Sequence, residues 1–73
     1  MARLDTSKNH YSVWANNDEG ASTDIGNGTS KTKLIEQARN ELGSGWTVHI
    51  DQLHLDNAGN VIGKEQIEQF RTR

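Results

Sequence analysis

The 73-residue chain contains no cysteine and no proline. Without cysteine it cannot form disulfides, thiolate zinc sites or cysteine nucleophiles, and this composition fits a reducing compartment. Without proline, its turns must rely on Gly, Asn and Asp. The chain also lacks an apolar run long enough to span a membrane, and no signal-peptide core follows Met1. These absences predict a soluble, cytoplasmic protein.

The chain carries little net charge, and it has few groups suited to catalysis. The formal net charge is −2, which gives no general electrostatic attraction to nucleic acid. No serine lies in a G-x-S-x-G elbow. A chain of 73 residues forms one domain with a thin core, which leaves little room for a water-excluding pocket. We therefore expect a protein that is not an enzyme and that has no catalytic residues, metal or cofactor.

The most informative stretch runs from Ser30 to Leu55, where a helical pattern is followed by a glycine and a strand pattern. Thr29 or Ser30 can cap the helix by accepting a bond from an early backbone N–H. Gly43 stands where a left-handed residue commonly ends a helix. The helix should bury one apolar stripe, made of Leu34, Ile35, Ala38 and Leu42.

The strand that follows should cover this stripe. Its inward positions, at period-two spacing, are Trp46, Val48 and Ile50. Leu53 and Leu55 then fall on the opposite parity. A bulge or bend near residues 51–52 would bring both sets of apolar side chains to the core, and we expect one there.

The remaining segments predict three further strands. Residues 10–15 alternate as a strand with Tyr11, Val13 and Ala15 on one face, and a turn follows at residues 16–20. Residues 21–26 form a weaker strand that the glycines at 26 and 28 should end. After a loop at residues 56–60 a strand resumes at Val61.

The last segment, residues 63–73, is ambiguous. Ile67 and Phe70 are three residues apart, which suits a helix, but a strand here would complete a sheet that one helix can cover. We favour the strand. The prediction is an α+β fold in which two strands, one helix and two strands form a small antiparallel sheet with the helix on one face. Residues 1–9 are expected to be a flexible N-terminus, and residues 10–73 a single domain.

Two motifs are similar to known binding sites, one for phosphate and one for a metal ion, but their spacing does not fit either site. Residues 26–32, GNGTSKT, are similar to a phosphate-binding loop, but the required glycines are missing at Ile25 and Ser30, so a capped helix start is the better interpretation. The repeats His49-Ile50-Asp51 and His54-Leu55-Asp56 could each offer two metal ligands. Their five-residue offset sends them to opposite faces of a regular strand, so no metal site is assigned.

The candidate binding residues lie in three places. Trp14 and His49 should project from the sheet face away from the helix, where a tryptophan can anchor a partner, although Trp14 could instead belong to the core. Lys31 and Lys33 lie in the first helical turn, where cations oppose the helix dipole and could meet an anionic partner. Two C-terminal arginines could contact phosphate: Arg71 and Arg73.

Three segments together, YSVWANNDEG, KLIEQARNELGSGWTVHI and LDNAGNVIG, resemble a class of short bacterial and phage proteins. In this class a hairpin precedes one helix and a second hairpin follows. Some phage-encoded inhibitors of CRISPR systems have a similar size and layout. The resemblance implies binding rather than catalysis, and it transfers no site residue.

The sequence therefore gives two functional hypotheses. The first is a protein-interaction module, encoded by a phage or mobile element, that binds a protein through its exposed sheet face or a strand edge. The free edge could equally form a homodimer. The second is a nucleic-acid-binding domain that uses Trp14, the two lysines at the helix start and the C-terminal arginines.

Overall fold

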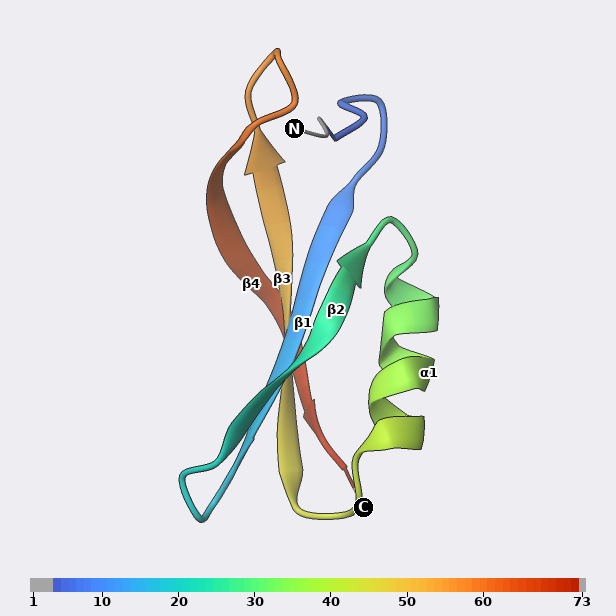
Figure 1. Cartoon of the computed structure of the whole chain (residues 1–73), viewed down its shortest axis with the longest axis vertical. Coiled ribbons are helices and arrows are strands. Elements are labelled where there is room, and N and C mark those ends of the chain that lie inside the picture. Colours follow the sequence, from blue (N-terminus) through green and yellow to red (C-terminus); the bar gives the residue numbers. More distant parts are fainter. Residues whose placement is uncertain (1–3, 73) are drawn as a thin grey trace.

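The computed structural model describes residues 4–72. Its four strands form one antiparallel sheet in the order β2-β1-β3-β4, and the helix covers one face (Figure 1). This arrangement confirms the predicted α+β fold and its element order. The elements are β1 (His10–Asn17), β2 (Ser22–Gly28), α1 (Lys31–Glu41), β3 (Trp46–Leu55) and β4 (Val61–Arg71).

Helix α1 begins as the sequence predicts and ends differently. The Ser30 hydroxyl accepts a hydrogen bond from the Lys33 backbone N–H at 3.3 Å, so Ser30 is the N-cap. At the other end Leu42 is extended, and its N–H donates to the Ala38 carbonyl at 2.9 Å. The left-handed residue predicted at Gly43 is instead Gly45, at φ +89°, because the turn into β3 closes two residues later.

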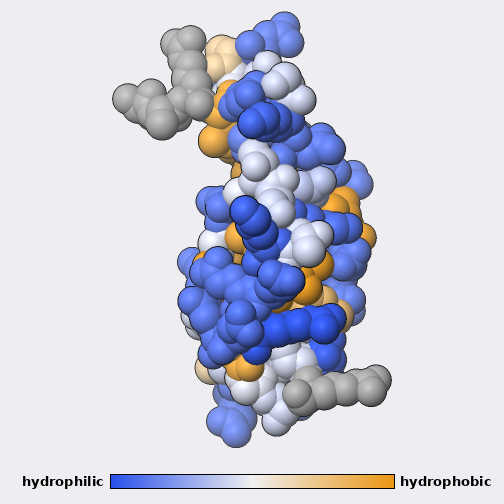
Figure 2. Space-filling model, turned by 90° about the vertical axis from the view of Figure 1, so that its right-hand side faces the viewer, coloured by the Kyte–Doolittle hydropathy of each residue, from blue (hydrophilic) through white to orange (hydrophobic). Residues whose placement is uncertain are grey.

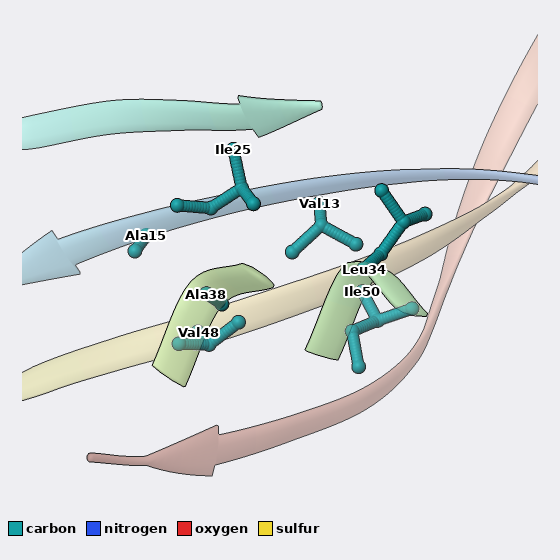
Figure 3. Close-up of a cluster of buried hydrophobic side chains, with 7 residues drawn as sticks. All are labelled: Val13, Ala15, Ile25, Leu34, Ala38, Val48 and Ile50. Carbon is teal, nitrogen blue, oxygen red and sulfur yellow. The ribbon is translucent and has the colours of Figure 1, made fainter. Parts of the chain in front are cut away.

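The core lies between α1 and the inner face of the sheet (Figure 3). Ile35, Leu42 and Trp46 pack against it while partly buried, as predicted. Ala15 and Ala38 are fully buried, and their small side chains allow the helix to lie close to the strands. The fully or nearly fully buried apolar residues are Val13, Ala15, Ile25, Leu34, Ala38, Val48 and Ile50.

Strand β2 does not end at Gly26, as the sequence suggested, but continues to Gly28. Gly26 has a φ of +156° and pairs with Val13, whereas Asp24 pairs with Trp14. Ile25 is thus the extra residue of a bulge, and it is buried. The bulge lets the sheet's short edge strand supply one large side chain to the core.

The bulge predicted near residues 51–52 does not turn Leu53 and Leu55 toward the core. Strand β3 pairs with β1 without interruption, and Leu53 lies opposite His10. By alternation both leucines stay on the face away from the helix, where they are partly buried. The register shift between β3 and β4 at this level comes from an extra residue in the edge strand β4, Ile67.

Strand β4 confirms the predicted strand at the C-terminal end. It runs for 11 residues, about 36 Å at strand spacing, whereas the 11 residues of α1 span only about 16 Å. The helix therefore covers part of the sheet and packs against β1 and β2. Two register shifts against β3 leave two residues of β4 without a partner, Ile62 and Ile67.

The far end of the β3–β4 hairpin is closed by hydrogen bonds. Asp56 accepts bonds from the backbone N–H groups of Ala58 and Asn60, both at 2.9 Å. The Leu4 N–H donates to the Gly59 carbonyl at 3.2 Å, so the segment before β1 contacts this hairpin (Figure 1).

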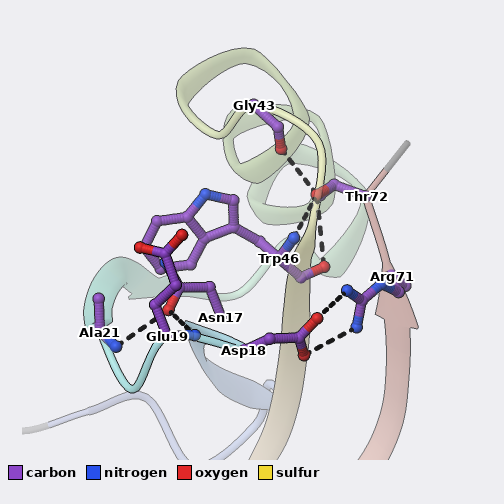
Figure 4. A network of polar contacts seen from close by, with 8 residues as sticks. All are labelled: Asn17, Asp18, Glu19, Ala21, Gly43, Trp46, Arg71 and Thr72. Atoms are coloured by element: carbon purple, nitrogen blue, oxygen red, sulfur yellow. Dashed lines mark hydrogen bonds and ion pairs between the residues drawn. The ribbon is translucent and has the colours of Figure 1, made fainter.

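Thr72 fastens the end of β4 to the turn between α1 and β3 (Figure 4). Its buried hydroxyl donates to the Gly43 carbonyl at 2.7 Å and accepts the Trp46 backbone N–H at 2.9 Å. The Thr72 backbone N–H donates to the Trp46 carbonyl at 2.7 Å. One side chain thus joins two segments that are distant in sequence, the end of β4 and the turn between α1 and β3.

We expect Thr72→Val to lower the free energy of unfolding by about 1–3 kcal/mol, because the shape is kept while a part-buried N–H loses its acceptor. Urea denaturation measures the change. Thr32→Val, at an exposed helix position, is the control and should change stability by no more than about 0.5 kcal/mol. Equal losses in the two variants would show that the Thr72 hydroxyl does not hold these segments together.

Candidate functional site: the open sheet face and strand β4

Trp14 and His49 both project from the open face of the sheet, opposite α1, as the sequence predicts. The two residues are directly opposite each other on β1 and β3. Their rings stack with centroids 4.1 Å apart and an interplanar angle of 17°. Trp14 is half-buried and is not part of the core, so the alternative that placed it there is wrong.

Polar side chains hold this stack in place. The Trp14 indole N–H donates to Asp51 Oδ2 at 3.2 Å, and Asp51 is buried. His49 Nε2 lies 2.6 Å from Asn16 Oδ1, and His49 Nδ1 lies 3.0 Å from Gln66 Oε1. Both rings therefore already have partners within the chain, which hold them in an ordered arrangement.

The helix-start lysines lie in the other layer of the fold. Lys31 and Lys33 belong to the first turn of α1, on the side of the sheet opposite Trp14. Lys31 Nζ is 3.2 Å from Glu68 Oε1 on β4, so this carboxylate partly neutralises the positive charge of Lys31. The structure therefore does not bring the lysines together with the tryptophan.

Arg71 forms a bidentate ion pair with Asp18. The two N–O distances are 2.6 Å and 3.3 Å, and the pair links the β1–β2 turn to the end of β4 (Figure 4). Hydrogen bonds from the Arg71 guanidinium lower the pKa of Asp18 below its ordinary value of 3.8. Arg73 lies outside the described residues.

Exposed apolar side chains gather on β4, which the sequence analysis did not single out. Within residues 4–72, the large hydrophobic residues with high exposure are Val61 at 51%, Ile62 at 68% and Ile67 at 39%. Ile62 and Ile67 are the two residues that the register shifts leave without a partner on β3. By contrast, the side of the molecule shown in Figure 2 is mainly hydrophilic, with separate small hydrophobic areas.

The residues of the two His-x-Asp repeats have separate surroundings. Asp51 accepts from Trp14, His54 lies 4.0 Å from Glu65, and Asp56 closes the hairpin turn. Within residues 4–72, no three His, Asp or Glu side chains gather in a way that could hold a metal ion. No helix in the same range has the length and hydrophobicity needed to cross a membrane.

Comparisons of this chain with protein-family models, with curated proteins and with solved structures gave no significant match. The function must therefore be inferred from the surfaces of the molecule itself.

We expect Trp14→Phe to lower the free energy of unfolding by about 1–3 kcal/mol, beyond the loss of ring packing, because Asp51 would keep a buried carboxylate without its indole donor. Chemical denaturation measures this loss. Trp46→Phe is the matched control, since no indole hydrogen bond is found for Trp46 among residues 4–72. A Trp14→Phe variant that loses no more stability than Trp46→Phe would contradict a structural role for this bond.

We expect the Asp18 carboxyl to titrate below 3.8, and Arg71→Gln to raise its pKa toward that value. Carbon-detected NMR of the side chain measures both. Because the pKa is lowered in the folded state, the pair stabilises the fold above the ordinary pKa and loses that effect as the pH falls through the folded value. An Asp18 pKa that is unchanged in Arg71→Gln would mean that the guanidinium is not its cause.

Proposed function

We propose that this chain is a small, non-enzymatic interaction module that binds a protein partner through strand β4. The observation that carries the proposal is the gathering of exposed apolar side chains on this one edge strand: Val61, Ile62 and Ile67. Exposed hydrophobic residues cost a monomer solubility, and several of them along one strand can mark an interaction surface. The absence of cysteine supports a place for this activity in the cytoplasm.

The edge position of β4 supports the same proposal. Strand β4 pairs only with β3, so the backbone groups along its outer side are available to a partner. Its two bulges interrupt the ladder at Ile62 and Ile67, which limits regular strand pairing to the stretches between them. The bulged isoleucines then serve as side-chain anchors beside a short backbone contact.

The open face is a weaker candidate for the same role. Trp14 is stacked on His49 and bonded to Asp51, so its ring and its polar atom are both used inside the chain. The nucleic-acid hypothesis stays a prediction that this geometry does not favour. Its cationic residues lie on different surfaces, and Lys31 and Arg71 are paired with carboxylates.

We expect Ile62→Lys to abolish capture of the partner from a lysate of the native host while leaving the far-UV circular dichroism unchanged, because Ile62 is 68% exposed. Asn40→Lys is the matched control. It adds the same charge at an exposed position on α1 and should capture the partner as the wild type does. Ile67→Lys should weaken capture as well.

Partner capture by both isoleucine variants at the wild-type level would overturn the proposal. Sedimentation of the purified chain adds a second measurement. If the wild type dimerises and Ile62→Lys does not, the partner that binds β4 is a second copy of this chain.

A further inference from the structure

A cavity of about 460 Å³ lies where the C-terminal end of α1 faces the end of β4. It forms because α1 reaches β4 through long side chains rather than by close packing. Near its start the helix contacts β4 through Lys31 and Glu68, and near its end Arg39 lies 5.1 Å above the ring of Phe70. The cavity volume is within the range of pockets that accept small organic groups.

Part of the lining of this cavity is apolar. It comes from Leu42 and Phe70, both partly buried against the edge of the core. Thr72 also lines the cavity, but its hydroxyl is bonded to Gly43 and to the Trp46 N–H. The cavity therefore offers an apolar group two hydrophobic side chains to pack on.

In the described part of the chain, the charged side chains that line the cavity are two arginines, and they differ in their ion pairing. The Arg71 guanidinium is held by Asp18 through two hydrogen bonds. Among residues 4–72, no carboxylate lies within ion-pair distance of Arg39. The Arg39 guanidinium, whose Cζ lies over the Phe70 ring, therefore has N–H groups that can bind a carboxylate.

We propose that this cavity binds a short peptide segment of the partner in which an apolar side chain lies next to a carboxylate. The apolar side chain would pack on Leu42 and Phe70, and the carboxylate would meet Arg39. The peptide nature of the ligand rests on the function proposed for β4, whose C-terminal half forms one wall. An anion is disfavoured at the carbonyl end of a helix, so carboxylate binding depends on the guanidinium.

The test is a ¹⁵N–¹H NMR titration of the full chain with 3-phenylpropanoate and, separately, with its uncharged amide. We expect saturable shifts at Arg39, Leu42, Phe70 and Thr72 with the carboxylate. The amide should bind about tenfold or more weakly, since a charge-assisted hydrogen bond is lost. Arg39→Gln should reduce carboxylate affinity to that of the amide. Lys31→Gln removes the same charge from the other end of α1 and should change nothing.

Equal binding of the two probes, equal effects of the two variants, or shifts centred elsewhere would overturn the proposal. The last titration uses the peptide acetyl-Ala-Phe-Glu-Ala-amide, which should shift the NMR signals of the same four residues. If only the small carboxylate binds, the assignment to a peptide is wrong. Ile62 does not line the cavity. The titration can therefore fail while the capture experiment succeeds, and the capture experiment can fail while the titration succeeds. The two proposals are thus tested separately.

Discussion

The fold depends on the contact between one short apolar stripe and one sheet face. Leu34 and Ala38 of α1 meet Val13, Val48 and Ile50, and this cluster contains the largest fully buried side chains among residues 4–72. In a domain of this size few other contacts exclude water, so the stability of the whole molecule rests on this layer. The position of the helix over β1 and β2 then decides which parts of the sheet remain uncovered.

The proposed interaction surfaces follow from the mismatch in length between helix and strands. A helix rises about 1.5 Å per residue and a strand about 3.3 Å, so equal residue numbers in α1 and β4 cannot cover equal lengths. The uncovered edge strand holds Ile62 and Ile67 at its bulges. The space between the helix end and the same strand becomes the cavity under Arg39. Both features are consequences of a core confined to part of the sheet.

Sequence reasoning succeeded where a single local pattern decided the outcome. The cap at Ser30, the stripe on α1, and the placement of Trp14 and His49 on the open face all follow from local periodicity and side-chain chemistry. It failed where the position of a residue depended on a neighbouring strand. The phase change at Leu53 suggested a bulge in β3, but pairing with β1 keeps β3 regular, and the irregularity moves to the free edge.

The amino-acid sequence by itself determined the order of the elements and the inner face of each central strand, because these depend on spacing within one segment. Only the tertiary structure decided which strands became the edges, which residues became bulges, and which charges met across the sheet. Examples are the bond between Asp18 and Arg71 and the exposure of Ile62. Such contacts join residues far apart along the chain, and their geometry is set by strand order and register, which no single segment encodes.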